Sequence, residues 1–149
     1  MILHPQLKQD CFVLGRFPLS VVLLMNDSQY PWFILVPQRQ DISEAHQLSG
    51  EDQQQLMRES SLLAKCIETE FNADKINIAA LGNIVPQLHI HHIVRYRTDP
   101  VWPAPVWGKL PALAYSKHDA DALCLRMRTL LSGSGMTGVD EHETNNAPA

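Results

Sequence analysis

Three histidines stand within four residues of one apolar segment, and their spacing is the first feature of the chain that could carry chemistry. They are His89, His91 and His92, within residues 87–94. We expect this segment to be a β-strand, in which side chains alternate between faces, so that Gln87, His89 and His91 share one face. Two imidazoles and an amide then stand side by side, about 7 Å apart along the strand, which is twice the rise per residue. Such a row matches the width of a phosphate group.

A neutral imidazole is a competent nucleophile near neutral pH, so this row predicts attack on a phosphorus atom. His89 is the candidate nucleophile, with one ring nitrogen facing the substrate and the other donating its proton to a fixed acceptor, such as a backbone carbonyl. His91 and Gln87 would flank the attacked group, one donating to a non-bridging oxygen and the other lying near the leaving group. A phosphohistidine intermediate would divide one difficult displacement into two easier ones.

Two other interpretations of this strand stay open. The histidines could do no more than satisfy buried hydrogen bonds, or they could bind zinc. Two imidazoles alone lack the third and fourth zinc ligands, and no carboxylate or cysteine lies nearby in the sequence, so we expect no metal site. We interpret His92, on the opposite face, as a structural or interfacial residue.

The elements that must position the histidine strand follow from the rest of the chain. Residues 11–17, 20–25 and 32–37 are β-rich runs separated by turn residues, which predicts an antiparallel meander. The run 20–25 is nearly all apolar, which indicates a strand covered on both faces. Two more strands are expected at 75–81 and 87–96, with a turn at Gly82 and Asn83 between them.

Two helices are also expected. Ser49 opens a capping-box pattern, and apolar residues then recur at helical spacing as far as Phe71, which predicts a long amphipathic helix over 50–72. This helix is inserted between the third and fourth strands. A final helix should run from Lys117 to about Leu131, capped by Ser116.

The sequence therefore predicts one α+β domain. We expect an antiparallel sheet of about five strands with one long helix packed on it and a C-terminal helix. The predicted boundaries are a domain over 1–132, made of a core at 10–96, a Trp- and Pro-rich loop at 97–115 and a helix at 116–132. Residues 133–149 are small and polar, and we expect a disordered tail there.

Charge and composition exclude several classes of partner. Twelve Lys and Arg against sixteen Asp and Glu give a formal net charge of −4, without the basic run that an extended nucleic acid requires. A small phosphorylated ligand needs only a few placed donors. Three widely spaced cysteines indicate reduced thiols, and we see neither a leader peptide nor an apolar run long enough to span a membrane. We expect a cytoplasmic protein.

The segment from Gly82 to Ile93 resembles the signature strand of the histidine-triad (HIT) superfamily, whose pattern is His-φ-His-φ-His-φ-φ with φ apolar. The upstream half is similar too, in the strand that ends at Asn26, in residues 32–37, and in residues 45–49 before the long helix. The resemblance covers roughly residues 10–96, and the order of elements is the order of this family.

The resemblance implies a HIT-like fold and a hydrolase or transferase acting at the α-phosphate of a nucleotide, such as a dinucleoside polyphosphate (the diadenosine polyphosphates included) or a nucleoside phosphoramidate. It implies that His89 is the nucleophile and that His91 is the third histidine of the triad. Asn26 falls where family members contact the ribose, and Asn83 falls where a polar side chain lies near the phosphates, although both also fit plain turn roles. A homodimer and chemistry without a bound cofactor are implied as well.

The chain departs from the family pattern at the first histidine, which is replaced by Gln87. The leaving-group side then keeps a hydrogen-bonding amide and loses a titratable ring. The preferred leaving group and base stay open, as do the choice between hydrolase and transferase and the role of the loop with Trp102 and Trp107. Two other functions stay open: a nucleotide-binding module with little turnover, and a structural or interaction protein.

Overall fold

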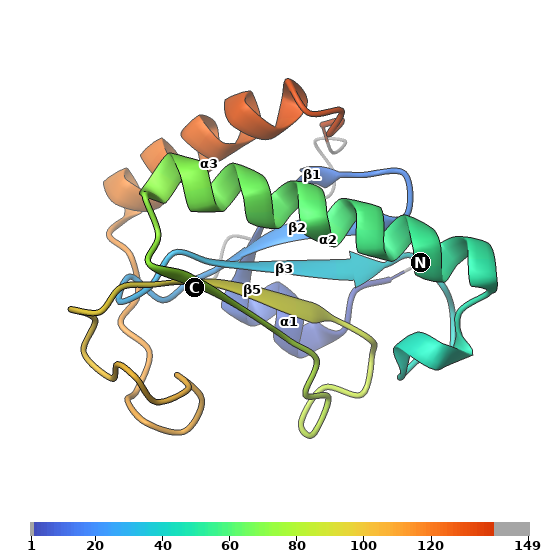
Figure 1. Cartoon of the computed structure of the whole chain (residues 1–149), viewed down its shortest axis with the longest axis horizontal. Coiled ribbons are helices and arrows are strands. Elements are labelled where there is room, and N and C mark those ends of the chain that lie inside the picture. Colours follow the sequence, from blue (N-terminus) through green and yellow to red (C-terminus); the bar gives the residue numbers. More distant parts are fainter. Residues whose placement is uncertain (1, 139–149) are drawn as a thin grey trace.

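The computed structural model describes residues 2–138 of the 149. Five strands form one antiparallel sheet in the order β1-β2-β3-β5-β4 (Figure 1), and three α-helices and a short 3₁₀-helix accompany it. The predicted α+β fold is therefore confirmed. The strands are β1 Cys11–Arg16, β2 Ser20–Met25, β3 Trp32–Pro37, β4 Lys75–Ala79 and β5 Ile90–Arg95; the helices are α1 Pro5–Asp10, η1 Ala45–Gln47, α2 Gly50–Phe71 and α3 Lys117–Ser132.

The first three strands form the predicted meander, each antiparallel to the next. β2 and β3 are central, and almost every residue in them is buried. Strands of this kind carry apolar residues on both faces because both faces are covered. β5 then pairs with β3, and β4 closes the sheet as an edge strand beside β5.

Two layers cover the sheet (Figure 1). On one face lie α2 and α3, whose buried residues share a core with the sheet, among them Leu63 of α2 and Met127 of α3. On the other face lie α1 and part of the loop 97–115, represented by Leu7 and Val106. Four prolines between positions 97 and 115 prevent regular structure in this loop.

α2 begins and ends within a residue of the predicted bounds. The Ser49 hydroxyl accepts a hydrogen bond from the Asp52 amide at 3.2 Å, which is the expected N-terminal cap. The carboxylate of Asp52 instead pairs with Arg39 at 2.6 Å, so the reciprocal half of a capping box is replaced by an ion pair. The helix ends at Phe71, and its C-terminal cap is Asn72, which adopts the left-handed conformation with φ of 48°. α3 likewise begins after Ser116, as predicted.

Helix α1 was not predicted. It is only six residues long, and its N-terminal cap is His4, whose Nδ1 accepts a hydrogen bond from the Gln6 amide at 3.2 Å. Six residues hold too little periodicity to be recognised, and histidine is not one of the usual capping residues. Pro5 occupies the first turn, where its missing N–H costs nothing.

The histidine segment differs from the prediction at its start, because β5 begins at Ile90 and not at Gln87. Before that point the chain is bonded elsewhere: the Leu88 amide donates to the Ile42 carbonyl at 2.9 Å, outside the ladder with β3. Pro86 immediately upstream has no N–H to donate. The sequence pattern shows that apolar and polar side chains alternate in this segment. It does not show where the backbone stops pairing with β3.

The expected tail divides into two parts. Residues 133–138 follow α3 back to the sheet, where Thr137 and Arg16 exchange backbone hydrogen bonds of 2.9 Å and Met136 is buried. Residues 139–149 lie outside the described residues, and the division of the chain at residue 132 stays a prediction. Within residues 2–138, none of the helices combines the length and apolar character needed to cross a membrane.

Candidate active site

The predicted alternation of side chains holds across the histidine segment even though only part of it is a regular strand. Leu88 and Ile90 pack into the core beneath α2, and His92 bonds to that helix. His91 faces the opposite side, where its ring contacts Trp32 and lies 4.9 Å from the ring of His89, measured between centroids. The structure therefore brings His89 and His91 together on the face away from α2.

His89 is oriented by its own backbone. Its Nδ1 lies 2.7 Å from the carbonyl oxygen of Gln87. A carbonyl only accepts, so Nδ1 carries the proton and Nε2 carries the lone pair. Nε2 has no hydrogen-bond partner among residues 2–138, and it is not one of the solvent-inaccessible polar atoms that lack a partner. The unprotonated nitrogen of this largely buried ring is thus open to a ligand.

His91 lies in an aromatic environment. Its Nδ1 accepts a hydrogen bond from the indole Nε1–H of Trp32 at 2.9 Å, and its ring meets the ring of Trp107 at 5.3 Å in an edge-to-face arrangement. Burial, reinforced by the neighbouring His89 and His92, lowers the pKa of His91 to about 3. This imidazole is neutral at physiological pH.

His92 is fully buried between β5 and α2. Its Nδ1 donates to the Ile90 carbonyl at 3.1 Å, so its Nε2 accepts from the hydroxyl of Ser60, 2.7 Å away. Burial lowers the pKa of His92 to about 4, against a smaller opposing effect of the Ile90 carbonyl. Both ring nitrogens are used, and His92 ties the histidine strand to the long helix, which fits the structural role expected from the sequence.

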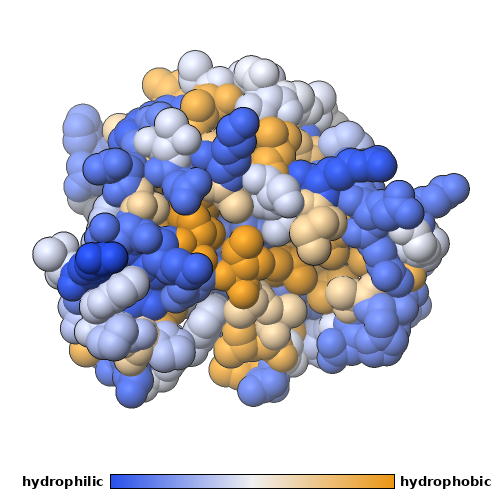
Figure 2. Space-filling view, in the orientation of Figure 1, coloured by the Kyte–Doolittle hydropathy of each residue, from blue (hydrophilic) through white to orange (hydrophobic). Residues whose placement is uncertain are grey.

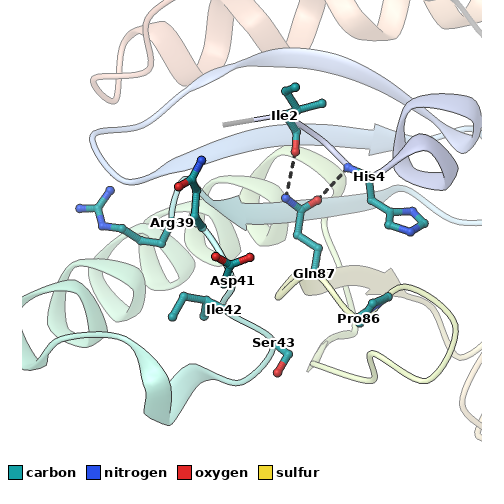
Figure 3. A pocket seen from close by; sticks show the side chains of 9 residues that line it. Ile2, His4, Arg39, Asp41, Ile42, Ser43, Pro86 and Gln87 are labelled. Carbon is teal, nitrogen blue, oxygen red and sulfur yellow. Dashed lines mark hydrogen bonds between the residues drawn. The ribbon is translucent and has the colours of Figure 1, made fainter.

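Gln87 holds the N-terminal segment of the chain. Its Oε1 accepts a hydrogen bond from the His4 amide at 2.9 Å, and its Nε2 donates to the Ile2 carbonyl at 3.2 Å (Figure 3). The side-chain amide therefore pairs with a stretch of backbone as a neighbouring strand would. It also lines a cavity of about 610 Å³, whose other walls come from Ile2, His4, Pro86 and residues 39–43.

Asn26 and its neighbour fasten the long loop to the sheet. The Oδ1 atom of Asn26 accepts a hydrogen bond from the Tyr115 amide at 2.9 Å. The next residue, Asp27, is buried and accepts from the amide of Gln29 at 3.1 Å and from that of Leu113 at 3.4 Å. Asn26 thus makes a structural bond, its ribose contact stays a prediction, and the part played by Asp27 was missed.

Asn83 lies in the loop between β4 and β5, where its side chain is exposed and makes no hydrogen bond to either histidine of the pair. The preceding Gly82 has φ of 69°, a conformation that favours glycine. The turn predicted at these two residues is present, within a longer connection that runs from residue 80 to residue 89.

Arg95 is a buried residue near the site that the sequence did not reveal. It is 1% exposed and pairs with Asp99 at 2.7 Å, with further bonds to the Asn77 side chain and the Ala104 carbonyl. Its guanidinium also lies 5.6 Å from the ring centre of Trp102. Arg95 thereby holds the loop 97–115, which carries Trp107 to His91. The only sequence signal was a lone arginine at the end of an apolar strand.

Potential metal-ligating side chains do not cluster in the part of the chain that the structure describes. Residues 2–138 contain no group of three or more His, Cys, Asp or Glu side chains placed to hold a metal ion. The three cysteines are free thiols, and burial raises the pKa of Cys11 and Cys124 above its ordinary value.

Comparison with known proteins identifies the fold and the family. A search of curated proteins gives no match. Among solved structures, a histidine triad protein from Marinobacter aquaeolei VT8 is 48% identical and has a TM-score of 0.86, covering 89% of this chain and 96% of its own. A histidine triad protein from Bradyrhizobium japonicum is 43% identical and has a TM-score of 0.83, covering 86% of this chain and 96% of its own. A histidine triad protein from Sinorhizobium meliloti 1021 is 42% identical and has a TM-score of 0.84, covering 87% of this chain and 96% of its own.

The family model of the HIT domain matches residues 6–98, which contain all five strands and the long helix. The matched region includes His89 and His91 and ends at the start of the loop 97–115, before Trp107. The chain therefore belongs to the HIT family.

Proposed function

We propose that this protein is a nucleotidyl hydrolase or transferase in which His89 attacks the α-phosphorus of a nucleotide. The observation that carries the proposal is the bond between Nδ1 of His89 and the Gln87 carbonyl. It fixes the ring so that Nε2 presents a lone pair without needing a separate base. The substrate class is a dinucleoside polyphosphate, of the diadenosine type for example, or a nucleoside phosphoramidate.

The reaction proceeds in two displacements. In the first, the Nε2 lone pair forms a bond to phosphorus while the bond to the leaving group breaks, and the leaving group departs with that electron pair. In the second, the oxygen of water or of another acceptor bonds to phosphorus, the N–P bond breaks, and the pair returns to Nε2. The acceptor's proton passes to solvent or to the departed group. Both steps are written with the His89 ring, the nucleotide and the acceptor alone.

The other predicted residues support this reaction in distinct ways. We assign His91 to a non-bridging oxygen of the phosphate, because it lies beside His89 on the same face. We assign Gln87 to the leaving-group side. Its amide and the N-terminal segment line the cavity of about 610 Å³ (Figure 3), whose described lining includes neither His89 nor His91. Asn26 and Asn83 are assigned to the nucleotide, Asn26 through the side-chain NH₂ that its bond to Tyr115 leaves available. The partner is a small nucleotide and not an extended nucleic acid, and we propose a cytoplasmic location.

We also propose that the protein is a homodimer that associates through β4. This edge strand carries the half-exposed Ile78, and the loop after it carries Ile84, which is 87% exposed. An apolar area covers this part of the molecular surface (Figure 2). Such an area on an edge strand favours association. Sedimentation equilibrium tests the proposal, and a monomer at micromolar concentration would refute it.

The covalent mechanism is tested by mass spectrometry. The protein is mixed briefly with an adenosine phosphoramidate or diadenosine polyphosphate and quenched in alkali, which spares phosphohistidine. We expect an adenylyl adduct on the peptide that contains His89. Hydrolysis that continues without any adduct on this residue would contradict the proposal.

A nucleotide-binding module with little turnover is the second candidate. It is favoured by Gln87, because the amide is held by the N-terminal backbone and cannot supply a proton to a leaving group. Calorimetric titration with AMP, combined with product analysis, separates the candidates. Binding without product favours the module, whereas binding with product favours the enzyme. The absence of both would leave the third candidate, a structural or interaction protein.

A further inference from the structure

We infer that Trp32 fixes His91 in the neutral tautomer that carries its proton on Nε2, which makes His91 a constant hydrogen-bond donor beside the lone pair of His89. The target of this donor, a phosphate oxygen, rests on the proposed function. The tautomer itself does not, because it follows from the contacts of His91 alone.

The bond between the two rings has only one possible direction. The indole nitrogen of Trp32 is a donor and has no lone pair to offer. It lies 2.9 Å from Nδ1 of His91 with a geometry suited to a hydrogen bond. Nδ1 must therefore be unprotonated, and the proton of the neutral ring must reside on Nε2.

The same bond opposes protonation of His91. Protonation would give the ring a second N–H, on Nδ1, and this N–H would point directly at the indole N–H of Trp32. The groups that titrate around the ring act in the same direction: His89 shares its face, and His92 follows it along β5. The elements packed against the ring contribute the uncharged Trp32 from β3 and Trp107 from the loop. His91 is thus held in one protonation state and one tautomer.

Trp32 is itself held firmly enough to impose this choice. It is the first residue of β3, is 6% exposed, and pairs in register with Ile93 of β5. Its indole meets the rings of Tyr30 at 6.4 Å and Trp107 at 5.8 Å, both edge to face. The indole therefore cannot turn away from His91 without disturbing two other aromatic rings.

The result is a pair of adjacent histidines held in opposite tautomers by two different devices. The carbonyl of Gln87 keeps the proton of His89 on Nδ1, and the indole of Trp32 keeps that of His91 on Nε2. One ring then presents a lone pair and the other presents an N–H. A phosphate needs both, since its phosphorus accepts a nucleophile and its oxygens accept hydrogen bonds. With the opposite tautomer, the lone pair on Nε2 of His91 would face the lone pairs of those oxygens.

The first test uses the unaltered protein, labelled with ¹⁵N. Protonated and unprotonated imidazole nitrogens resonate far apart, so a long-range ¹H–¹⁵N spectrum at pH 7 identifies the tautomer of His91. An N–H···N hydrogen bond also transmits a scalar coupling between its two nitrogens. We expect an unprotonated Nδ1 on His91 that is coupled to Nε1 of Trp32. A protonated Nδ1 would overturn the inference.

The second test compares two variants that each remove one indole N–H beside His91. Trp32→Phe removes the N–H that bonds to Nδ1. Trp107→Phe removes an N–H that is buried and has no partner among the described residues, while it retains an aromatic ring against His91. We expect Trp32→Phe to populate the other tautomer and Trp107→Phe to retain the original one. If Trp32→Phe keeps the tautomer, or if both variants lose it, packing and not the hydrogen bond is responsible, and the inference fails.

The kinetic consequence is a loss in kcat. For Trp32→Phe we expect kcat to fall roughly tenfold with little change in KM, the size of one net hydrogen bond felt in the transition state. If the variant does not fold, the coupling in the unaltered protein still decides the question. The two proposals fail separately. The expected tautomer without any nucleotide turnover refutes the function alone, whereas turnover that requires His89 with a protonated Nδ1 on His91 refutes this inference alone.

Discussion

Nδ1 of His89 and the carbonyl oxygen of Gln87 lie 2.7 Å apart, two residues along the same segment. The contact is local, so the ring of His89 is oriented by the chain that carries it and not by a distant acid. Substitution of the Gln87 side chain therefore leaves this bond available. The backbone and the side chain of Gln87 have separate tasks, one facing His89 and the other facing the N-terminal segment.

Replacement of the proposed nucleophile gives the first prediction. We expect His89→Ala to lower kcat by roughly 10³-fold or more, as loss of a group that forms a covalent intermediate does. Assays of adenosine phosphoramidate hydrolysis measure this change. His118→Ala is the control, because His118 is exposed on α3 and should leave the rate unchanged. Full activity of the His89 variant would contradict the assigned nucleophile.

Removal of the Gln87 amide gives the second prediction. Gln87→Ala deletes the bonds to the His4 amide and the Ile2 carbonyl, so residues 2–5 should lose protection against hydrogen exchange. The free energy of unfolding should fall by about 1–2 kcal/mol, the net value of one or two hydrogen bonds. Peptide-resolved hydrogen exchange measures the first effect and urea denaturation the second. An N-terminal segment that stays protected would show that α1 alone holds it.

The contrast between local and distant contacts also explains what the sequence could predict. Strands β1 to β3 and helices α2 and α3 were recognised because hydrophobic periodicity and serine caps are local signals. The face shared by His89 and His91 followed from alternation alone. The contact of Trp32 with His91 spans 59 positions and that of Asn26 with Tyr115 spans 89, and both depend on strand pairing and loop packing. No local pattern encodes them.

The two buried histidines of β5 give a third prediction, on the pH dependence of stability. The pKa of His92 is lowered to about 4 and that of His91 to about 3, whereas an unfolded histidine titrates near 6.5. Between these values the unfolded state binds protons that the folded state does not, so stability falls as the pH falls. Each histidine should account for a loss of about 2 kcal/mol in the free energy of unfolding between pH 6.5 and pH 5, since one pKa unit corresponds to about 1.4 kcal/mol.

Urea denaturation at several pH values measures this slope. His92→Gln removes one of the two groups and should roughly halve the loss of stability between pH 6.5 and pH 5. Because Ser60 donates to His92, a glutamine there can still accept that bond. A stability that does not change across this range would show that the two rings are protonated in the folded protein.

Two arginine–carboxylate pairs of opposite burial give the last prediction. The side chains of Arg95 and Asp99 are 1% and 3% exposed, whereas those of Arg126 and Glu70 are 51% and 27% exposed. Arg95→Met leaves the Asp99 carboxylate buried without its partner, so we expect a loss of about 3–5 kcal/mol in the free energy of unfolding. Arg126→Met is the matched control and should cost about 1 kcal/mol or less.

Loss of Arg95 should also change the position of Trp107 beside His91, because Arg95 holds the loop that places Trp107 there. A Trp107→Phe background separates the two effects in fluorescence. The spectral change caused by Arg95→Met should diminish when Trp107 is absent, whereas the loss of stability should persist. If Arg95→Met costs no more than its exposed counterpart, the buried pair does not anchor the loop, and the position of Trp107 must depend on the bonds that Asn26 and Asp27 make to residues 113–115.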